Sequence, residues 1–519
     1  MSAIVHSCTV QCYSCVLAVV PAVGAPLAQS AEHSHGKAGV VGSIPTGGSI
    51  IKVGCTDIIK MTQTNRIVEE LRRALPDGKV LSDSEISEDY SHDEAYATVP
   101  QMPAAVVLPN ATDDVVAVVD TAARIGVSVT PRGSGTGLAG GCIPAPGGVV
   151  VSFQNMRSIL EIDTANNVAV VEPGVTLREL DEEAAKYGLA YPIVIGEKSA
   201  SIGGMVATNA GGMQAVKYGV TRNHVLGLEV VLSSGKVIHT GGKLFKLSSG
   251  YDLTQLFVGS EGTLGVVTEI TVRLVPRMEY RTTLLVPFTD LVDATAAVPK
   301  ITSSGIGPLI LEYIDALTMD AITRDVGLEL GIDESIKSKC SAYLVVVLED
   351  RVESSAEKGM EDVTAIVTAN GAEEVYVLPS PVAMRLLEAR DRAHWMAKAN
   401  GANDIVDVVV PRAAMADFMQ SVSEISQKMN SLVVGCGHAG DGNVHLSVFQ
   451  PDPDVRHSVV LSILRSGVQF GGGVSAEHGI GKAKRSDFIE LEDAAKLDVM
   501  RKIKSALDPA GLFSPGNVL

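Results

Sequence analysis

The chain has 519 residues, of which 46% are hydrophobic and 20% are charged, and its formal net charge at pH 7 is −18. This length predicts two or three domains, and the composition is that of an ordinary globular protein. The negative charge argues against a nucleic-acid partner, because it would repel a phosphate backbone. The sequence holds no run of about 18 uncharged apolar residues that would predict a transmembrane segment, although peripheral membrane contact is still compatible with it.

The first 60 residues lack the periodicity of a helix or a strand. They hold four of the seven cysteines, and the other three are scattered over the rest of the chain. This distribution does not indicate a disulfide framework, and it therefore predicts a protein of the reducing cytoplasm. From Met61 onward, Ile67, Leu71 and Leu75 fall on one helical face. We therefore interpret residues 1–60 as a disordered or spurious extension and expect the folded chain to begin at Met61.

Short apolar runs alternate with amphipathic stretches in the next part of the chain. Strands are predicted at 104–109, 127–133, 148–153 and 167–174, and helices at 113–126 and 176–189. A hairpin is predicted over 225–241, with its turn at Ser-Ser-Gly. Thr176 is expected to cap the second helix, because Glu179 follows three residues later, as in a capping box. We expect the first domain to cover residues 61–278.

A second alternation begins after residue 278 and predicts a separate α+β domain over 279–480. Strands are predicted at 281–288, 308–315, 341–350 and 372–380, with helices between them. A later hairpin joins 431–438 to 444–449 through the turn "AGDGN". An amphipathic helix is predicted near 492–507, within a C-terminal segment (481–519) that we expect to return to the first domain.

A glycine-rich loop, "PRGSGTGLAGG" (131–141), follows a predicted strand and contains G-x-G-x-x-G from Gly135 to Gly140. In a Rossmann site a helix follows this motif at once, so that its N-terminus meets the pyrophosphate. Here Pro144 and Pro146 exclude that helix. We therefore interpret the stretch as a loop that holds a pyrophosphate through backbone N–H groups alone.

Two further stretches rich in small residues, 199–219 and 248–270, occur at predicted strand ends. Small side chains let a large flat ligand lie against the backbone. Together with loop 131–141, these stretches resemble flavoenzymes that share the FAD fold of vanillyl-alcohol oxidase and p-cresol methylhydroxylase (PCMH). Within that group the chain resembles the branch of D-lactate dehydrogenase, the glycolate oxidase D-subunit and D-2-hydroxyglutarate dehydrogenase, from about residue 61 to residue 519.

The resemblance implies an α+β fold, with a PCMH-type FAD-binding domain of two subdomains and a ferredoxin-like substrate cap domain. It implies FAD held non-covalently, because loop 131–141 contains no histidine. In that family the loop wraps the pyrophosphate, and the other two stretches line the adenine and the isoalloxazine. The cofactor-binding residues that it implies are Pro131, Arg132, Gly133, Ser134, Gly135, Thr136, Gly137, Leu138, Ser201, Gly204, Ala207, Asn209, Gly211, Gly212, Gly219, Glu261, Gly262, Gly265 and Val267.

Two histidines flank the turn of the later hairpin, at His438 and His445. Strand alternation alone would put them on opposite faces, but an irregular turn can bring both imidazoles together. Two neutral imidazoles at one point suit a divalent cation such as Zn²⁺ and need a third ligand. Glu477 and His478, adjacent in the glycine-flanked stretch "GGGVSAEHGIGKAKR", supply the candidates.

The resemblance assigns roles to these residues. It implies that His438, His445 and Glu477 bind the metal and that His478 is the general base. The family usually has glycine where this chain has Ala476, a departure of one methyl group that weakens the assignment only slightly.

A substrate carboxylate needs a cation, and Arg390 matches the family arginine that pairs with it. A guanidinium can bind a carboxylate through two parallel hydrogen bonds; the alternative is a solvated helix face, since Asp391 could pair with nearby cations. The hydroxyglutarate branch has a lysine two positions before the matching aspartate, where this chain has Ile405 before Asp407. A small monocarboxylate, D-lactate or glycolate, is therefore favoured over a dicarboxylate.

The expected activity is oxidation of a D-2-hydroxy acid to the 2-oxo acid by hydride transfer to flavin N5, with a divalent metal and a histidine base. An external acceptor (a cytochrome, a quinone or an iron–sulfur subunit) would re-oxidise the flavin. Three alternatives stay open: a D-2-hydroxyglutarate dehydrogenase, an FAD subunit that only transfers electrons within a complex, and an ether-lipid synthase of the same flavin fold. The last expects a run of adjacent histidines that is not found, and the electron-transfer subunit predicts loss of the metal and base residues.

Overall fold

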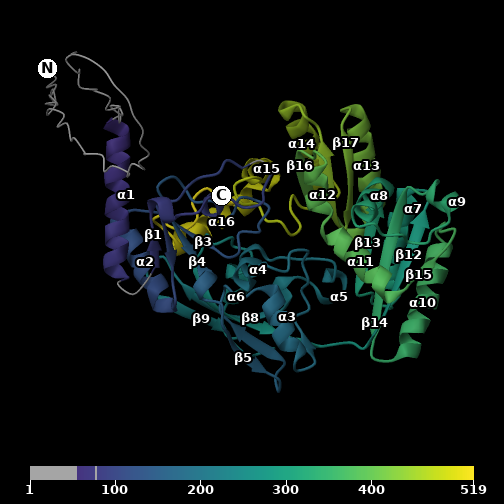
Figure 1. Cartoon of the computed structure of the whole chain (residues 1–519), viewed down its shortest axis with the longest axis horizontal. Helices are drawn as coiled ribbons and strands as arrows, with labels where there is room; N and C mark the ends of the chain where they lie inside the picture. The colour runs from purple at the N-terminus through teal and green to yellow at the C-terminus, as the bar shows by residue number, and fades with distance from the viewer. Residues whose placement is uncertain (1–54, 76–78, 97) are drawn as a thin grey trace, which may run out of the picture. The chain divides into compact units, whose positions relative to one another are not determined.

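The computed structural model describes residues 55–75, 79–96 and 98–519 (Figure 1). Most of the expected extension, residues 1–54, lies outside the described residues. Helix α1 (Cys55–Ala74) includes six residues before Met61, so the helix does not begin at the expected start. Ile67, Leu71 and Leu75 are buried along one side of this helix, as the periodicity predicts.

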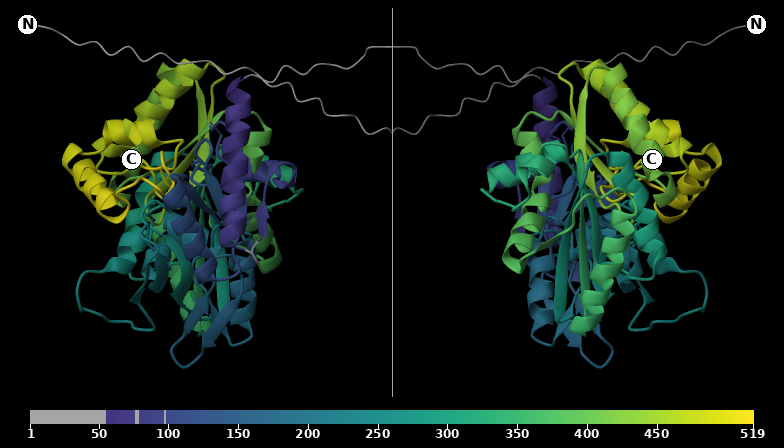
Figure 2. Two further views of the ribbon diagram at one scale, coloured as in Figure 1. Left: turned by 90° about the vertical axis from the view of Figure 1, so that its left-hand side faces the viewer. Right: turned by 90° about the vertical axis from the view of Figure 1, so that its right-hand side faces the viewer.

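The first sheet has four strands in the order β1-β2-β4-β3. Their bounds are β1 (Lys79–Leu81), β2 (Ala105–Leu108), β4 (Val149–Ser152) and β3 (Val129–Arg132). The last three strands run parallel, and their apolar runs are typical of strands buried on both faces. Helix α2 (Thr112–Ile125) and α1 pack together beside this sheet, as the purple and blue helices of Figure 2 show.

The second sheet has five antiparallel strands in the order β5-β6-β10-β8-β9. The strands are β5 (Ile159–Asp163), β6 (Val168–Val171), β10 (Val266–Arg273), β8 (Val225–Val231) and β9 (Val237–Gly241). The predicted hairpin is present as β8 and β9, with Val231 paired to Val237. Helix α3 (Leu177–Ala185) begins after Thr176, which forms the predicted capping box with Glu179.

The third sheet has seven strands in the order β15-β12-β14-β13-β17-β18-β16. Their bounds are β12 (Tyr280–Phe288), β13 (Ile310–Asp315), β14 (Ala342–Asp350), β15 (Tyr376–Leu378), β16 (Asp404–Val409), β17 (Leu432–Gly437) and β18 (Asn443–Phe449). All pairs are antiparallel. The first four strands, with helices after β12 and β14, have the split βαβ arrangement of a ferredoxin-like unit.

Helices cover both faces of this third sheet. One face packs on α7 (Leu291–Ser303), α10 (Glu353–Thr368), α13 (Met415–Lys428) and α14 (Pro453–Gln469). Part of the other face packs on α8 (Ala316–Asp325) and α11 (Ser380–Asp391). Because side chains alternate along a strand, Val406 and Val408 point to the first face and leave Asp407 on the second. That second face carries the site described below.

The end of the chain lies against the first sheet. Helices α15 (Arg485–Leu491) and α16 (Ala494–Leu507) lead to a segment in which Phe513 pairs with Val129 of β3. The N–H of Val129 donates to Leu512 O (2.9 Å), and the N–H of Ser514 donates to Val129 O (2.9 Å). Figure 1 shows this yellow segment beside β3 and β4. About 380 residues of chain separate these neighbours.

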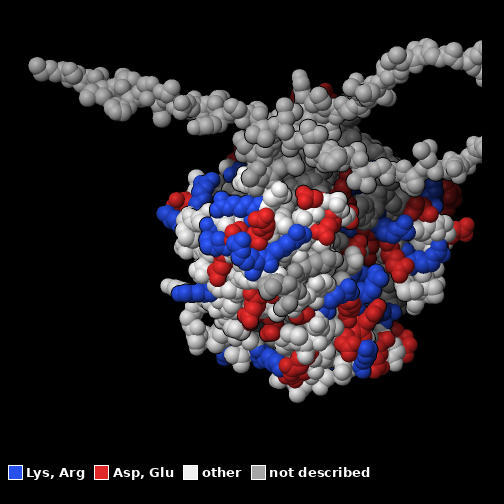
Figure 3. Space-filling model, turned by 60° about the vertical axis from the view of Figure 1, so that its left-hand side comes forward, with Lys and Arg blue, Asp and Glu red and all other residues white. Residues whose placement is uncertain are grey.

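Charged side chains of both signs are interspersed over much of the coloured surface in Figure 3. Among the described residues, no helix is long and apolar enough to cross a membrane.

Candidate functional site

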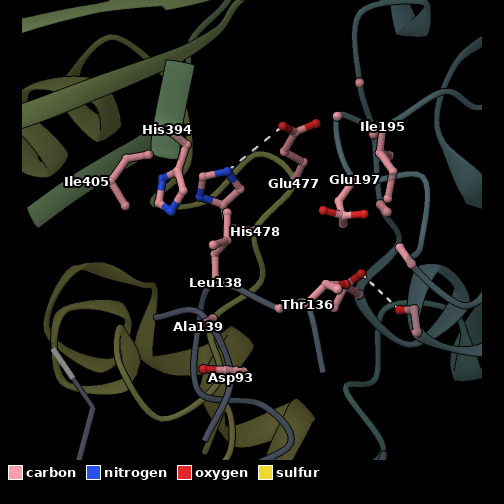
Figure 4. A pocket seen from close by; sticks show the side chains of 18 of the residues that line it. Asp93, Thr136, Leu138, Ala139, Ile195, Glu197, His394, Ile405, Glu477 and His478 are labelled. Carbon is pink, nitrogen blue, oxygen red and sulfur yellow. Dashed lines mark hydrogen bonds and ion pairs between the residues drawn. The ribbon is translucent and has the colours of Figure 1, made fainter. Parts of the chain in front are cut away.

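A cavity of about 530 Å³ is lined by the glycine-rich loops and by the second face of the third sheet. All five expected catalytic and metal-binding residues line it, as does every expected cofactor residue except Asn209 and Gly219. The sequence-predicted cofactor cradle and the sequence-predicted metal site therefore open into one cavity, part of which Figure 4 shows.

The glycine loop after β3 packs closely on helix α4 (Ile202–Thr208). A side chain at Gly133 would place its Cβ 2.0 Å from Ser201 Oγ, so it would displace the Ser201 hydroxyl or the loop. Ser201 is itself fixed, because its hydroxyl caps α4 by accepting from the N–H of Gly204 (3.2 Å). The loop is thus held against α4 with its backbone facing the cavity, as a pyrophosphate cradle requires.

The two expected cofactor residues that do not line the cavity shape its walls. Asn209 has a left-handed backbone (φ 54°) at the end of α4, and its side chain accepts from the N–H of Arg222 (2.9 Å). Gly219 (φ 81°) ends the short helix α5 (Ala215–Tyr218), where a Cβ would lie 2.3 Å from Asn223 Oδ1. Both residues are placed to set loop geometry.

Three potential metal ligands converge on one point of the cavity wall. Glu477 Oε1 lies 3.4 Å from His438 Nε2 and 3.2 Å from His445 Nε2, and the three ligand atoms lie within 4.8 Å of one another. His445 lies on β18, opposite Cys436, whereas His438 lies one residue beyond β17 in the turn. The irregular turn therefore overcomes the alternation that would separate the two imidazoles. This donor set of two imidazoles and one carboxylate fits a divalent cation.

Buried carboxylates lie behind both imidazoles. His438 Nδ1 is 2.6 Å from Glu312 Oε1, and His445 Nδ1 is 3.6 Å from Asp407 Oδ1. Both acids are fully buried on the same face of the third sheet. A carboxylate behind a histidine orients the ring and raises its basicity toward a metal. Burial alone would raise the pKa of Glu312, but Arg390 and His438 hold it below its ordinary value.

His478 lies next to the three potential ligands. Its ring stacks on that of His445 with centroids 5.1 Å apart, and its Nε2 lies 3.9 Å from Glu477 Oε1, the contact dashed in Figure 4. Burial lowers the pKa of His478 to about 3, although Asp407 opposes the shift. A neutral imidazole is the protonation state that a general base needs.

Arg390, near the end of α11, points into the same cavity and is buried. Its Nε lies 2.6 Å from Glu312 Oε2, and its terminal Nη2 lies 3.4 Å from His438 Nδ1. The solvated helix face considered as an alternative is therefore wrong. Glu312 therefore faces the Nε side of the guanidinium, and one terminal nitrogen lies beside His438.

Three residues of the site were missed from the sequence: Glu312, Asp407 as a structural anchor, and His394. The sequence did contain a pattern that indicates Glu312 and Asp407. Each is an acidic residue within an apolar strand, and a buried charge there needs a partner. His394 lies beside His478 and Ile405 in Figure 4. Within the described part of the chain, neither of its ring nitrogens has a hydrogen-bond partner. Burial, with nearby Lys398, lowers the pKa of His394 to about 4.

Two family models match the chain. Residues 103–241 match a FAD binding domain, and residues 277–518 match the C-terminal domain of FAD linked oxidases. These matches, together with the glycine-lined cavity between them, define a FAD-linked oxidoreductase.

Similar proteins specify the family. A FAD-linked oxidoreductase of Mycobacterium tuberculosis is 48% identical over 439 residues, which cover 85% of this chain and 96% of that protein. D-lactate dehydrogenase of Anaerostipes hadrus is 34% identical, covering 88% and 97%, and glycolate oxidase subunit GlcD of Bacillus subtilis is 36% identical, covering 82% and 91%. The chain belongs to the FAD-linked oxidoreductase family of the D-lactate, glycolate and D-2-hydroxyglutarate dehydrogenases.

The structure of p-cresol methylhydroxylase with substrate bound superposes with a TM-score of 0.70 at 18% identity, covering 88% of this chain and 97% of that chain. At this identity the likeness concerns the fold alone. It confirms the predicted α+β fold with a PCMH-type FAD-binding domain.

Proposed function

We propose that the chain oxidises a small D-2-hydroxy acid, D-lactate or glycolate, to the 2-oxo acid, with non-covalently held FAD and a divalent metal, Zn²⁺. The observation that carries this proposal is the convergence of His438, His445, Glu477, His478 and Arg390 in the cavity that the cofactor loops line. An FAD subunit that only transfers electrons would have no use for this set of residues.

The residues present fit both groups. Loop 131–141 lines the cavity with several glycines, whose backbone N–H groups no side chain covers, which suits a pyrophosphate. His438, His445 and Glu477 would hold the metal, because one ligand atom from each lies within 4.8 Å of the other two. When bound, FAD supplies the hydride acceptor and the metal supplies a Lewis acid for the α-hydroxyl.

The side chains of this chain would then do three things. The terminal nitrogens of Arg390 bind the substrate carboxylate and orient the Cα–H bond. His478 takes the hydroxyl proton. Burial of Arg390, His438 and His445 excludes water and strengthens each electrostatic contact.

The substrate side of the cavity favours a monocarboxylate. Ile405 lines it and supplies no charge for a second carboxylate. One observation supports a second candidate, a dicarboxylate such as D-2-hydroxyglutarate: His394 presents two unpartnered ring nitrogens in the same wall. The Stutzerimonas stutzeri relative of this name is 30% identical.

In this proposal a cytochrome, a quinone or an iron–sulfur subunit re-oxidises the flavin. The protein then acts in the cytoplasm, with peripheral membrane contact if the acceptor is a quinone.

The test is the visible spectrum of the purified, FAD-containing protein under anaerobic conditions, recorded before and after adding D-lactate, glycolate, L-lactate or D-2-hydroxyglutarate. Bleaching of the flavin band by D-lactate or glycolate is expected, with L-lactate inert. Bleaching by D-2-hydroxyglutarate alone would show that the substrate is the dicarboxylate of the second candidate function. A flavin band that no hydroxy acid bleaches would overturn the proposal.

A further inference from the structure

The segment 475–481, "SAEHGIG", carries both Glu477 and His478, yet it belongs to no helix or strand. It therefore lacks the backbone hydrogen bonds that regular structure would give, and its N–H groups need other partners. Figure 4 shows Glu477 and His478 on this one loop. The position of the metal ligand and of the base depends on whatever holds the loop.

Asp407 holds the first half of the segment. Its Oδ2 accepts from the N–H groups of Ala476 (3.0 Å), Glu477 (3.1 Å) and His478 (2.9 Å), and from the hydroxyl of Ser475 (2.8 Å). The side chain is 0% exposed. A carboxylate this deeply buried is stable only when donors surround it, and here the loop backbone supplies most of them.

Glu261 holds the second half. Its Oε1 accepts from the N–H of Ile480 (2.8 Å), and its Oε2 accepts from the N–H of Gly481 (2.7 Å). The bend at Gly479 (φ 79°) brings the backbone so close that a Cβ there would lie 3.1 Å from Glu261 Oε1. Both carboxylate oxygens of Glu261 are thus engaged by the loop, although the residue was expected to bind the cofactor.

The two carboxylates come from different parts of the fold, which we call the cofactor half (the first and second sheets with their helices) and the substrate half (the third sheet with its helices). Asp407 lies on β16 of the third sheet, whereas Glu261 lies between helix α6 (Leu253–Phe257) and β10 of the second sheet. Just beyond Gly481, the N–H groups of Lys482 and Ala483 donate to Ala139 O in the glycine loop (2.9 and 3.0 Å). The metal-site loop is therefore fastened at one end to the substrate half and at the other end to the cofactor half.

We propose, on the basis of the metal site proposed above, that Asp407 and Glu261 are positioning residues that set metal affinity by holding the 475–481 loop. Of these two residues, Glu261 gives the more informative test. The cofactor half supplies none of the three proposed metal ligands, and in this proposal it controls metal binding only through the Glu261 carboxylate. The outer partners of metal ligands affect metal affinity by about 10- to 100-fold.

The experiment uses the full-length, FAD-loaded protein and its Glu261→Gln and Asp407→Asn variants. Zn²⁺ affinity is measured by competition with a chromogenic chelator, and backbone amide exchange of the peptide spanning 475–481 is followed by mass spectrometry. The matched controls are Glu269→Gln on β10 and Asp404→Asn on β16, neither of which contacts the loop. His438→Ala serves as the reference for a lost ligand.

Glu261→Gln and Asp407→Asn are expected to weaken Zn²⁺ binding by about tenfold or more. Faster exchange is expected at 480–481 in the first variant and at 476–478 in the second, and neither control should differ from wild type. If Asp407→Asn does not fold, Ser475→Ala is used in its place, because it removes only one of the donors to the Asp407 carboxylate.

Wild-type affinity and exchange in Glu261→Gln would overturn the inference, as would faster exchange spread over the whole chain, which would indicate general destabilisation. A wild-type protein whose Zn²⁺ binding is no stronger than that of His438→Ala would refute the metal site itself, which is a separate outcome.

Discussion

At the scale of single residues, the site depends on acids in apolar strands. Glu312 and Asp407 interrupt runs of Val, Ile and Leu on β13 and β16, and alternation aims both at the cavity face. Glu312 contacts His438 Nδ1 and pairs with Arg390, and Asp407 accepts from the backbone N–H of His478. Removing one member of such a buried pair leaves an uncompensated charge, which costs about 3–5 kcal/mol. For the pair of Glu312 and Arg390, a substitution that preserves charge is therefore the informative one.

Arg390→Lys keeps a positive charge beside Glu312 but removes the two-pronged edge that a carboxylate needs. We expect the variant to fold and to retain FAD, with a KM for D-lactate about tenfold or more above wild type. Steady-state kinetics with an artificial acceptor measures this. An unchanged KM would show that Arg390 serves only as the partner of Glu312.

Ile405→Lys adds a cation to the substrate wall. We expect kcat/KM for D-2-hydroxyglutarate relative to that for D-lactate to rise by about tenfold, because a second carboxylate gains a partner. Ile405→Met, which adds length without charge, is the control. Identical ratios in the two variants would place Ile405 outside the substrate site.

At the scale of elements, apolar runs, caps and turns could be predicted well from the sequence. The α3 capping box, the β8–β9 hairpin and every strand of the third sheet except β16 lie where local patterns indicate. The contacts that hold the 475–481 loop could not be predicted. They join Gly481 to Glu261 and His478 to Asp407 across long stretches of chain, and no local periodicity encodes such a pairing.

The glycine loop makes a prediction at this scale. Gly133→Ala would drive a Cβ to 2.0 Å from Ser201 Oγ, so the Ser201 hydroxyl must leave its capping position on α4 or the loop must shift. We expect the variant to purify with much less FAD and to bind added FAD about tenfold or more weakly, because a misplaced cradle loses backbone contacts.

Gly147→Ala provides the comparison for Gly133→Ala. Its added methyl meets nothing within 4 Å, and it strains only the backbone, at φ 72°. Fluorescence titration with FAD compares the two variants. Equal affinities would mean that the fit of the loop on α4 does not matter for the cofactor.

At the scale of the whole molecule, the last residues complete the first sheet. Phe513 is fully buried beside β3 in the cluster that also contains Val129 and Leu71. The contact between Phe513 and β3 could not be predicted from local patterns, because an amphipathic helix followed by a turn does not specify which sheet it meets.

Phe513→Ala should destabilise the cofactor half by about 3–5 kcal/mol, the usual cost of emptying a buried aromatic site. Thermal release of flavin fluorescence is the measurement, and a lower release temperature is expected. Val499→Ala, at a side chain 54% exposed on α16, should leave that temperature unchanged. Equal temperatures in the two variants would show that the C-terminal segment adds no stability.

The central claim is that hydroxy-acid oxidation at the flavin depends on a metal held by His438, His445 and Glu477. Its most direct test is the anaerobic rate of flavin bleaching by D-lactate, or by glycolate if that is the better substrate, after chelation and again after addition of Zn²⁺. We predict that chelation abolishes bleaching, that Zn²⁺ restores it in the wild type, and that Zn²⁺ fails to restore it in His438→Ala. Bleaching at the wild-type rate in chelated protein of verified zero metal content would contradict the account.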